Sequence, residues 1–341
     1  MVCLFLMGFS APSWSHVRWF VSPDDPLPSV SFDTNYISVL IALGVLAYGG
    51  FCGFLQRHHY RVDWLKFWWV APIPLGEFKW KLLRAGISVL LVGNIALEVF
   101  IAPNLTLLSM STQWILLVQS ALLISLILGD MFFAMALMLV LLGITVMFPF
   151  AIWIDYVFEF MALVLAFLLL GISQWLERDN VANRRGLTVE STDQMAVSVI
   201  RLGLGLQLMV LAIHNKLMDP AMALMFVENH AYLNFMQLLG LTAFTHLHFV
   251  LAGGLAELCF GLLLALNVSS RFVAITVSFF FLASSLILGM HELVGHVPIL
   301  ACLLVIVISP ETNSMVLVKR IWKEVWSMKR FTKMVGQMKR S

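Results

Sequence analysis

The feature that most limits how this chain can fold is its series of long apolar stretches. Nine of them come near the roughly 20 residues that cross a bilayer as a helix, and short polar segments separate them. They are 36–55, 82–102, 113–129, 131–150, 154–175, 197–217, 248–267, 271–290 and 293–310. Only 12% of the 341 residues are charged, which is about half the share of an ordinary soluble domain. The sequence predicts an all-α, polytopic bundle of about nine transmembrane helices.

The segment that precedes the first stretch predicts an exported N-terminus. Residues 1–15 form a short apolar run that ends in Ser13-Trp14-Ser15, with small residues at the two positions that a signal peptidase recognises. Cleavage there makes His16 the first residue of a periplasmic segment, 16–35. The run has no Lys or Arg before its apolar part, so an uncleaved start is the alternative.

The distribution of basic residues predicts the orientation. Nine crossings that start outside leave 19 of the 21 Lys and Arg in the cytoplasm, and only Arg18 and Lys216 outside, as the positive-inside rule requires. The cytoplasmic parts include a linker, 176–196, and a basic tail, 311–341, patterned like an amphipathic helix that lies on anionic lipid. We expect a multi-pass protein of a bacterial inner membrane, with the lipid bilayer and not nucleic acid as its partner.

The apolar stretches contain an internal repeat. Segment 84–103 aligns without a gap to 201–220, with an arginine at the start of each helix and a proline at its end, at an offset of 117 residues. Further along, the pattern Asp155-x3-Glu159 corresponds to Glu292-x3-His296, at an offset of 137 residues. Duplication is common among membrane folds. We expect two parallel four-helix units, at 82–175 and 197–310, the first preceded by one extra helix so that its domain is 36–175.

Ionisable residues inside spanning helices are costly and therefore suggest function or pairing. Glu257 lies in the middle of an apolar stretch, in Gly253-x3-Glu257-x3-Gly261, which places it on a closely packing helix face. Lys216 ends the preceding helix on the outer side, and Arg201 begins that helix on the inner side. These three are the candidate catalytic residues, although Arg201 also fits a simple positive-inside anchor.

Histidines are concentrated on the predicted outer side, which holds seven of the nine. Imidazole and carboxylate groups there suit a copper ion or another transition metal. If cleavage exposes His16, its amine and imidazole could together chelate copper. The spacing of His291 and His296 excludes the zinc motif H-E-x-x-H, so separate segments must combine, and inert interfacial histidines are the alternative. The candidate metal ligands are His16, His246, His248, His291, Glu292 and His296.

Part of the second unit resembles a known family. Arg201 with Gly203, Lys216, Glu257 followed by Gly261-Leu262-Leu263-Leu264, and Arg271 are similar to the DoxX family of small four-helix membrane proteins. The resemblance covers about 110 residues, and the longer bacterial members also have a start like His16-Val17-Arg18. It implies a four-helix bundle. The family includes subunits linked to thiosulfate:quinone oxidoreduction and many members with no assigned activity, so fold transfers better than function.

Two hypotheses follow. In the first, the protein is a DoxX-like component of envelope redox or metal chemistry, with Glu257 and Lys216 as a buried pair near an outer histidine site. Quinone, or another membrane or periplasmic redox protein, is then a possible partner. In the second, it is a noncatalytic scaffold or assembly factor for an envelope complex. A transporter ranks third, because no broken helices face a midplane site.

Overall fold

The computed structural model describes residues 27–30, 35–58, 78–98, 100, 112–178 and 189–309, and these residues form helices without any strand. The predicted signal peptide, His16 and the basic tail lie outside this described part. The long helices are α2 (Tyr36–His58), α4 (Phe78–Ala96), α5 (Thr112–Leu128), α6 (Asp130–Met147), α7 (Phe150–Arg178), α9 (Val189–Ala212), α12 (His246–Ala265), α13 (Ser270–Leu288) and α14 (Met290–Ile308). Each overlaps one of the nine apolar stretches.

Single glycines separate two pairs of these helices. Gly129 between α5 and α6 has φ 141°, and Gly289 between α13 and α14 has φ 93°. Side chains with a Cβ rarely adopt such backbone conformations, whereas glycine does so readily. The two continuous apolar runs are therefore divided into helical hairpins, as predicted at Gly129 and near Gly289.

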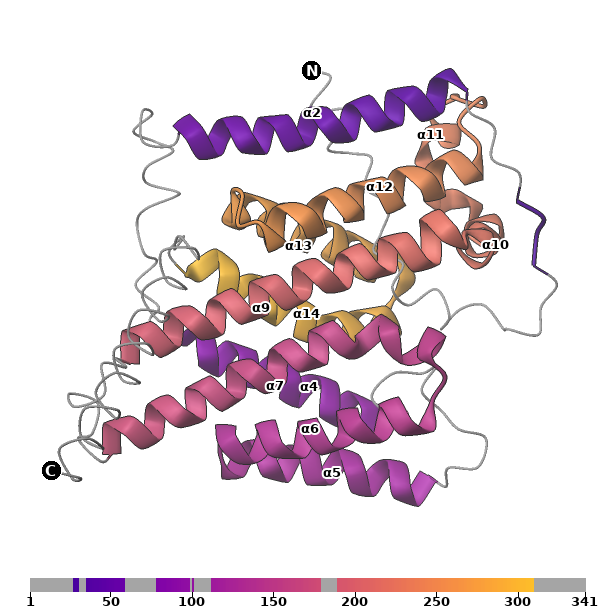
Figure 1. The fold of residues 1–341 in the computed structure, drawn as a ribbon. Helices are drawn as coiled ribbons and strands as arrows, with labels where there is room; N and C mark the ends of the chain where they lie inside the picture. Colours follow the sequence, from indigo (N-terminus) through magenta and orange to yellow (C-terminus); the bar gives the residue numbers. More distant parts are fainter. Residues whose placement is uncertain are drawn as a thin grey trace, which may run out of the picture.

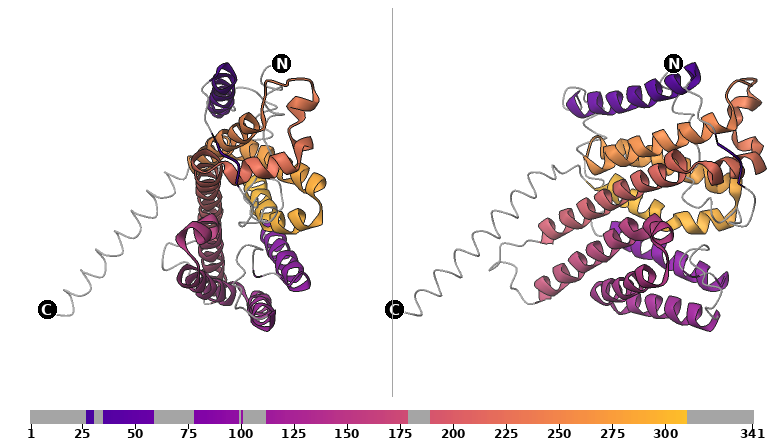
Figure 2. Two further views of the ribbon diagram at one scale, coloured as in Figure 1. Left: turned by 90° about the vertical axis from the view of Figure 1, so that its right-hand side faces the viewer. Right: turned by 45° about the vertical axis from the view of Figure 1, so that its right-hand side comes forward.

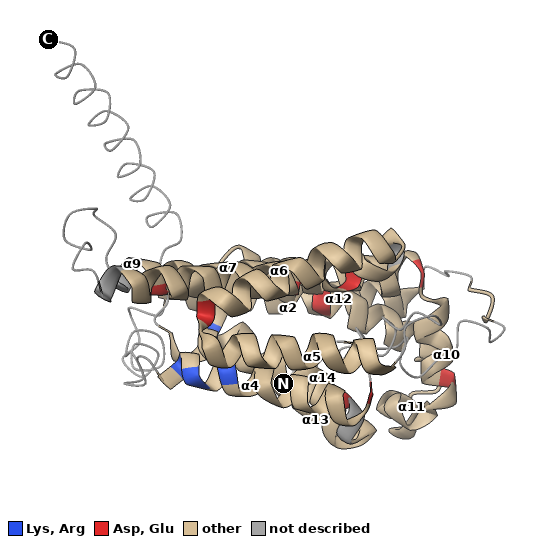
Figure 3. Cartoon of the chain, turned by 90° about the horizontal axis from the view of Figure 1, so that it is seen from below, with Lys and Arg blue, Asp and Glu red and all other residues tan. Residues whose placement is uncertain are grey.

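The helices lie side by side, with α2 at one edge of the bundle and α5 at the opposite edge (Figures 1 and 2). We call the end at which α4 and α9 begin the basic end, because Lys and Arg of α4 lie there (Figure 3). The opposite end carries the short helices α10 (Ala221–Asn229) and α11 (Phe235–Leu238). We call it the α10 end.

Within the part of the chain that the structure describes, six helical segments are long and apolar enough to cross a membrane. They are Tyr36–His58, Asp130–Met147, Ile152–Trp175, Thr192–Met218, His246–Ala265 and Ser270–Leu288. Thr112–Leu128 and Glu292–Ile308 are shorter apolar helices. Large apolar side chains such as Val146 and Leu286 lie 85% and 87% exposed, which water disfavours. The structure therefore fits a multi-pass protein in a lipid bilayer.

Helix packing links the first and second halves of the chain. In the first half α4 packs on α5, α5 on α6 and α6 on α7, and in the second half α9 packs on α12, α12 on α13 and α13 on α14. Between the halves, α7 packs on α9 and α14 packs on α4. The last helix of each half thus contacts the first helix of the other.

Candidate functional site

The candidate site begins with a very close approach of α9 and α12. A Cβ added to Gly261 would lie 2.6 Å from the backbone oxygen of Gly205, and one added to Gly205 would lie 2.7 Å from that of Gly261. One added to Gly254 would lie 2.9 Å from the Lys216 Cβ. Glu257 is thus on a face with Gly254 and Gly261, at the i, i+3, i+7 spacing of neighbours on a helix. The predicted face began one residue earlier, at Gly253, which is also buried.

A π-helix positions Lys216. Residues Ile213–Met218 form this element, η3, at the end of α9, with the wide i to i+5 hydrogen bond from the Asp219 N–H to the His214 oxygen at 3.2 Å. Short π-helical turns are rare in proteins, and many of those that occur are at functional sites. The His214 Nδ1 lies 3.3 Å from Asp155 Oδ1 of α7, while Lys216 contacts α12. This turn therefore directs the His214 and Lys216 side chains toward different helices.

Lys216 and Glu257 form an ion pair inside the bundle. The Lys216 ammonium group donates a hydrogen bond to Glu257 Oε1, and the Lys216 side chain is only 1% exposed. Two such charges lose several kcal/mol of hydration each when they leave water, so each side chain depends on the other. The contact predicted between Lys216 and Glu257 is present.

A second buried pair lies on α14. Glu292 Oε1 is 3.4 Å from His296 Nε2, and the His296 side chain is fully buried. The His296 Nδ1 lies 3.2 Å from the Ser285 hydroxyl oxygen, and the imidazole packs against the Phe281 ring at 4.5 Å between centroids. Glu292 Oε2 is buried and has no hydrogen-bond partner among the residues that the structure describes. Buried polar atoms without partners are rare and call for an explanation.

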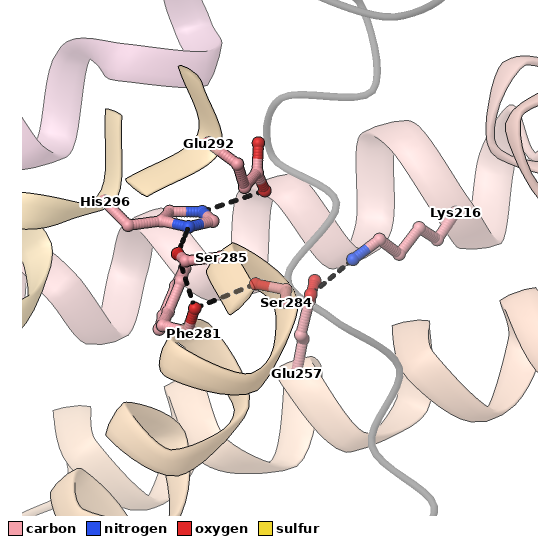
Figure 4. Close-up of polar contacts among 7 residues, drawn as sticks. All are labelled: Lys216, Glu257, Phe281, Ser284, Ser285, Glu292 and His296. Atoms are coloured by element: carbon pink, nitrogen blue, oxygen red, sulfur yellow. Dashed lines mark hydrogen bonds and ion pairs between the residues drawn. The ribbon is translucent and has the colours of Figure 1, made fainter. Parts of the chain in front are cut away.

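The two pairs form one site at the α10 end, which we call the four-residue site: Lys216, Glu257, Glu292 and His296. Figure 4 shows the Lys216–Glu257 pair and the Glu292–His296 pair beside each other, with Ser284 and Ser285 of α13 between them. Glu292 is close enough to Lys216 for the two to interact electrostatically. The site contains two carboxyl groups and one lysine. Because an unbalanced charge in an apolar interior is costly, it needs one further proton or cation.

The other predicted metal ligands form separate hydrogen-bonded groups or are not described. His248 Nδ1 accepts a hydrogen bond from the Thr245 N–H at 3.1 Å, and His248 Nε2 lies 2.9 Å from the Asn35 amide nitrogen. His246 Nδ1 lies 3.2 Å from the amide nitrogen of Asn234. Both histidines thus hold the start of α12.

His16 and the side chain of His291 lie outside the described part. In the remainder, no group of three or more His, Cys, Asp or Glu side chains is placed to hold a metal ion. Glu292 and His296 are the two adjacent members of the predicted set.

Arg201 lies away from the four-residue site. Its guanidinium group donates hydrogen bonds to the backbone oxygens of Leu264 and Ala265, the last residues of α12. Fifteen helical residues separate it from Lys216, or about 22 Å at 1.5 Å per residue. Arg201 and Lys216 thus lie toward opposite ends of the apolar stretch 197–217, as the sequence predicted, and a catalytic role of Arg201 stays a prediction. Arg201 satisfies carbonyl groups that every helix C-terminus leaves without partners.

Arg271, the other basic residue in the resemblance to the DoxX family, also bonds to the backbone at the end of a helix. It donates from Nε to the Ser309 oxygen at 2.8 Å, just beyond the end of α14.

Sequence reasoning missed Ser285 and Phe281, which hold the His296 ring. One serine and one phenylalanine in an apolar stretch give no signal of their own. The sequence signal for this part of the site is the pair Glu292 and His296, whose i, i+4 spacing places them on one helix face.

Comparisons of the chain with models of protein families, with curated proteins and with solved structures found no match. The resemblance to the DoxX family rests on the residues quoted for it.

Proposed function

We propose that this protein is a DoxX-like component of redox chemistry at the periplasmic face of a bacterial inner membrane. Its four-residue site exchanges protons with a membrane-soluble redox partner of the quinone class. The observation that carries the proposal is the composition of this site: two buried carboxyl groups and a buried histidine accompany a single lysine. Because the charges of such a site balance only with one further proton, the site can take up a proton that a partner releases.

The chemistry of quinones fits such a site. Reduction of a quinone to a quinol takes up two electrons and two protons, and oxidation releases them, so a group that gives and accepts protons must lie near the ring. Glu, His and Lys are common general acids and bases, and chains of buried Glu and His carry protons in membrane proteins. In this proposal, Glu292 and His296 exchange the proton. Lys216 holds Glu257 ionised and limits the charge that Glu292 can carry.

The proposed topology has nine crossings, with the N-terminus in the periplasm and the C-terminus in the cytoplasm. Single-residue and other short connections, such as Gly129 and Gly289, require neighbouring helices to reverse direction. Lys79, Lys81 and Arg84 lie at the basic end, which agrees with a cytoplasmic position. The four-residue site would then lie toward the periplasm.

A duplication also agrees with the packing. Because α7 packs on α9 and α14 packs on α4, exchanging the two halves preserves these contacts, as two parallel repeats about an axis along the membrane normal would. Arg84 bonds to Asp130, which follows the end of α5, and Arg201 bonds to the end of α12. The two arginines of the repeat thus reach corresponding turns.

The test measures binding of a short-chain quinone to the purified protein in lipid nanodiscs by isothermal titration. Lys216→Met combined with Glu257→Leu should abolish binding or weaken it by at least about 2 kcal/mol, since two charge-assisted contacts are lost. Lys79→Met is the matched control, because Lys79 is also a buried lysine in an ion pair, with Asp193 at 2.7 Å. Equal binding by the wild type and the double variant would contradict the proposal.

The metal form of this hypothesis depends on His16 and His291. It predicts stoichiometric copper or another transition metal in the purified protein, lost in His16→Ala, in His291→Ala and in His296→Ala. Metal analysis of protein purified without chelators and without an affinity tag that binds metal tests it. A metal content well below one ion per chain would exclude this form and leave the quinone proposal standing.

The glycine contacts favour the second candidate function, a noncatalytic scaffold for an envelope complex. Gly205 and Gly261 bring α9 and α12 into backbone contact, so the ion pair could serve only to fix helix packing. The scaffold hypothesis predicts that partner capture fails in Gly261→Ala, while the same substitution at Gly143, where a Cβ meets nothing within 4 Å, has no effect. If the Lys216→Met and Glu257→Leu double variant no longer binds quinone but still captures a partner protein, that result would favour this candidate.

A further inference from the structure

A second polar position lies deeper in the bundle. Apolar side chains of α9, α13 and α14 line a small pocket, together with two polar ones, Glu159 of α7 and Gln207 of α9. Its apolar members include Phe281, the residue that also packs against His296. The pocket therefore adjoins the four-residue site across a single side chain.

Gln207 is fully engaged by the backbone of α7. Its amide nitrogen donates to the Asp155 oxygen at 2.7 Å, and its amide oxygen accepts from the N–H of Phe158 at 3.1 Å and of Glu159 at 3.3 Å. Inserting a side chain into the hydrogen bonds of a helix locally distorts it. The amide nitrogen also lies 3.5 Å from the Ile154 oxygen, so both of its N–H groups are directed at the α7 backbone. This contact fixes the α7 turn that carries Glu159.

The Glu159 carboxyl group has neither an ion pair nor a side-chain hydrogen bond within the described ranges. The buried carboxyl groups of the described part have partners, for example Asp130 with Arg84 and Glu257 with Lys216, whereas Glu159 is only partly buried and lines the apolar pocket. An ionised carboxylate without a partner is very costly in an apolar interior, and the group then takes up a proton. Glu159 thus has the surroundings of a neutral carboxylic acid.

One turn of α13 connects this pocket to the four-residue site. The hydroxyl groups of Ser284 and Ser285 donate to the Phe281 oxygen at 2.9 and 2.8 Å, and the Ser285 oxygen lies 3.2 Å from His296 Nδ1 (Figure 4). Phe281 thus lines the pocket that Glu159 also lines, and its ring packs against the His296 imidazole.

We propose that Glu159 is an internal proton-binding site that exchanges its proton with His296 past the Phe281 ring. The Glu159 carboxylic acid loses its proton and becomes a carboxylate, and the imidazole accepts that proton and becomes an imidazolium that faces Glu292. No electron moves in this step. The inference rests on the proposed function, since it extends the proton chemistry of the four-residue site by one group toward the middle of the bundle.

Infrared spectroscopy of the protein in lipid bilayers at neutral pH tests the proposal. The wild type should show a carboxylic-acid C=O stretching band that is lost in Glu159→Gln, a nearly isosteric change. Glu228→Gln is the matched control at an exposed position of α10, and it should keep the band. A spectrum in which Glu159→Gln removes no such band would overturn the proposal, because Glu159 would then be ionised.

Exchange into D2O tests the path. The Glu159 band should shift as deuterons replace protons, and His296→Gln should slow that shift by roughly a hundredfold, as expected for loss of a positioned proton-transfer group. An equal exchange rate in His296→Gln and the wild type would overturn the path. Quinone binding is measured separately, so failure here would leave the result for the Lys216 and Glu257 double variant unaffected.

Discussion

The two ends of the bundle both contain buried ion pairs, but the pairs differ in how completely their atoms are bonded. At the basic end Asp130 accepts bonds from Arg84 Nε at 2.8 Å, from a second Arg84 nitrogen and from Gln174 at 2.8 Å. Asp193 likewise accepts from Lys79 and from the Trp80 indole. Both oxygens of each carboxylate have partners, which is what a purely structural ion pair requires.

At the α10 end the bonding is incomplete. Glu257 pairs with Lys216, whereas Glu292 has a 3.4 Å contact to His296 through one oxygen and no hydrogen-bond partner in the described part for the other. The exposures differ too: the Arg84 side chain is 31% exposed, but Lys216 is 1% exposed. Each ion pair of the basic end thus has one partly exposed member, which can relax into water and lipid headgroups after a change, whereas both members of the Lys216–Glu257 pair are buried. This contrast suggests stability at one end and proton chemistry at the other.

The largest expected effect is on the buried lysine. Lys216→Met leaves the Glu257 carboxylate without its partner, and it should lower the free energy of unfolding by about 3–5 kcal/mol. Adding Glu257→Leu should restore most of this loss, since an apolar pair can replace a buried ion pair at little cost. Unfolding in mixed micelles with increasing SDS measures both. The double variant is then stable enough for the binding experiment.

Lys79→Met is the comparison at the basic end. Asp193 is 33% exposed and keeps its bond from the Trp80 indole, so the loss should be about 1 kcal/mol or less. Similar losses for Lys79→Met and Lys216→Met would contradict the contrast between the two ends.

The second prediction concerns the Arg84–Asp130 pair. Asp130→Asn removes two charge-assisted contacts between α4 and α6, each with a partly exposed arginine, and should cost about 1.5–3 kcal/mol. The same unfolding experiment measures it. Quinone binding should stay at the wild-type level, and a loss of binding in folded Asp130→Asn would show that the basic end also takes part in the function.

The sequence predicted the helices well because they depend on local properties. Apolar length and the glycines at 129 and 289 determine where helices lie and where they reverse. It also predicted the contact of Lys216 with Glu257, because two opposite charges in adjacent apolar stretches have few other partners. The number of crossings and the duplication stay predictions, although the packing of the halves agrees with them.

Contacts between distant helices were harder to predict. In the sequence Asp130 only separates two apolar stretches, and its pairing with Arg84 depends on how α4 and α6 pack. Gln207 is an ordinary polar residue until α7 is placed against α9. The sequence places the histidines at 246, 248, 291 and 296 on one side of the membrane, but residues on the same side need not bind the same ion. Their separate partners follow from the fold alone.

The third prediction separates Arg201 from the site. Arg201→Met removes the hydrogen bonds to the Leu264 and Ala265 oxygens but keeps a long apolar side chain in the same place. Stability should fall by about 1–2 kcal/mol, the range for a lost hydrogen bond from a charged donor that is partly offset by removing a buried charge. Quinone affinity should not change. A weaker affinity with unchanged stability would place Arg201 among the functional residues.

The smallest predicted effect is at the start of α12. The Thr245 hydroxyl accepts from the His248 N–H at 3.3 Å, and His248 Nδ1 accepts from the Thr245 N–H in return, so the two residues cap the helix reciprocally. Thr245→Ala should cost about 0.5–1 kcal/mol and speed hydrogen exchange in the first turn of α12. Thr245→Ser, which keeps the oxygen, is the control and should behave like the wild type.

The outcome for Thr245 also decides what His248 does at the α10 end. If His248 only caps α12, then Thr245→Ala and His248→Ala should lower stability by similar amounts and should combine with little further loss, because each removes half of one reciprocal contact. If His248 instead serves the four-residue site, His248→Ala should weaken quinone binding while Thr245→Ala does not. Binding measured on these two folded variants distinguishes a helix cap from an additional member of the site.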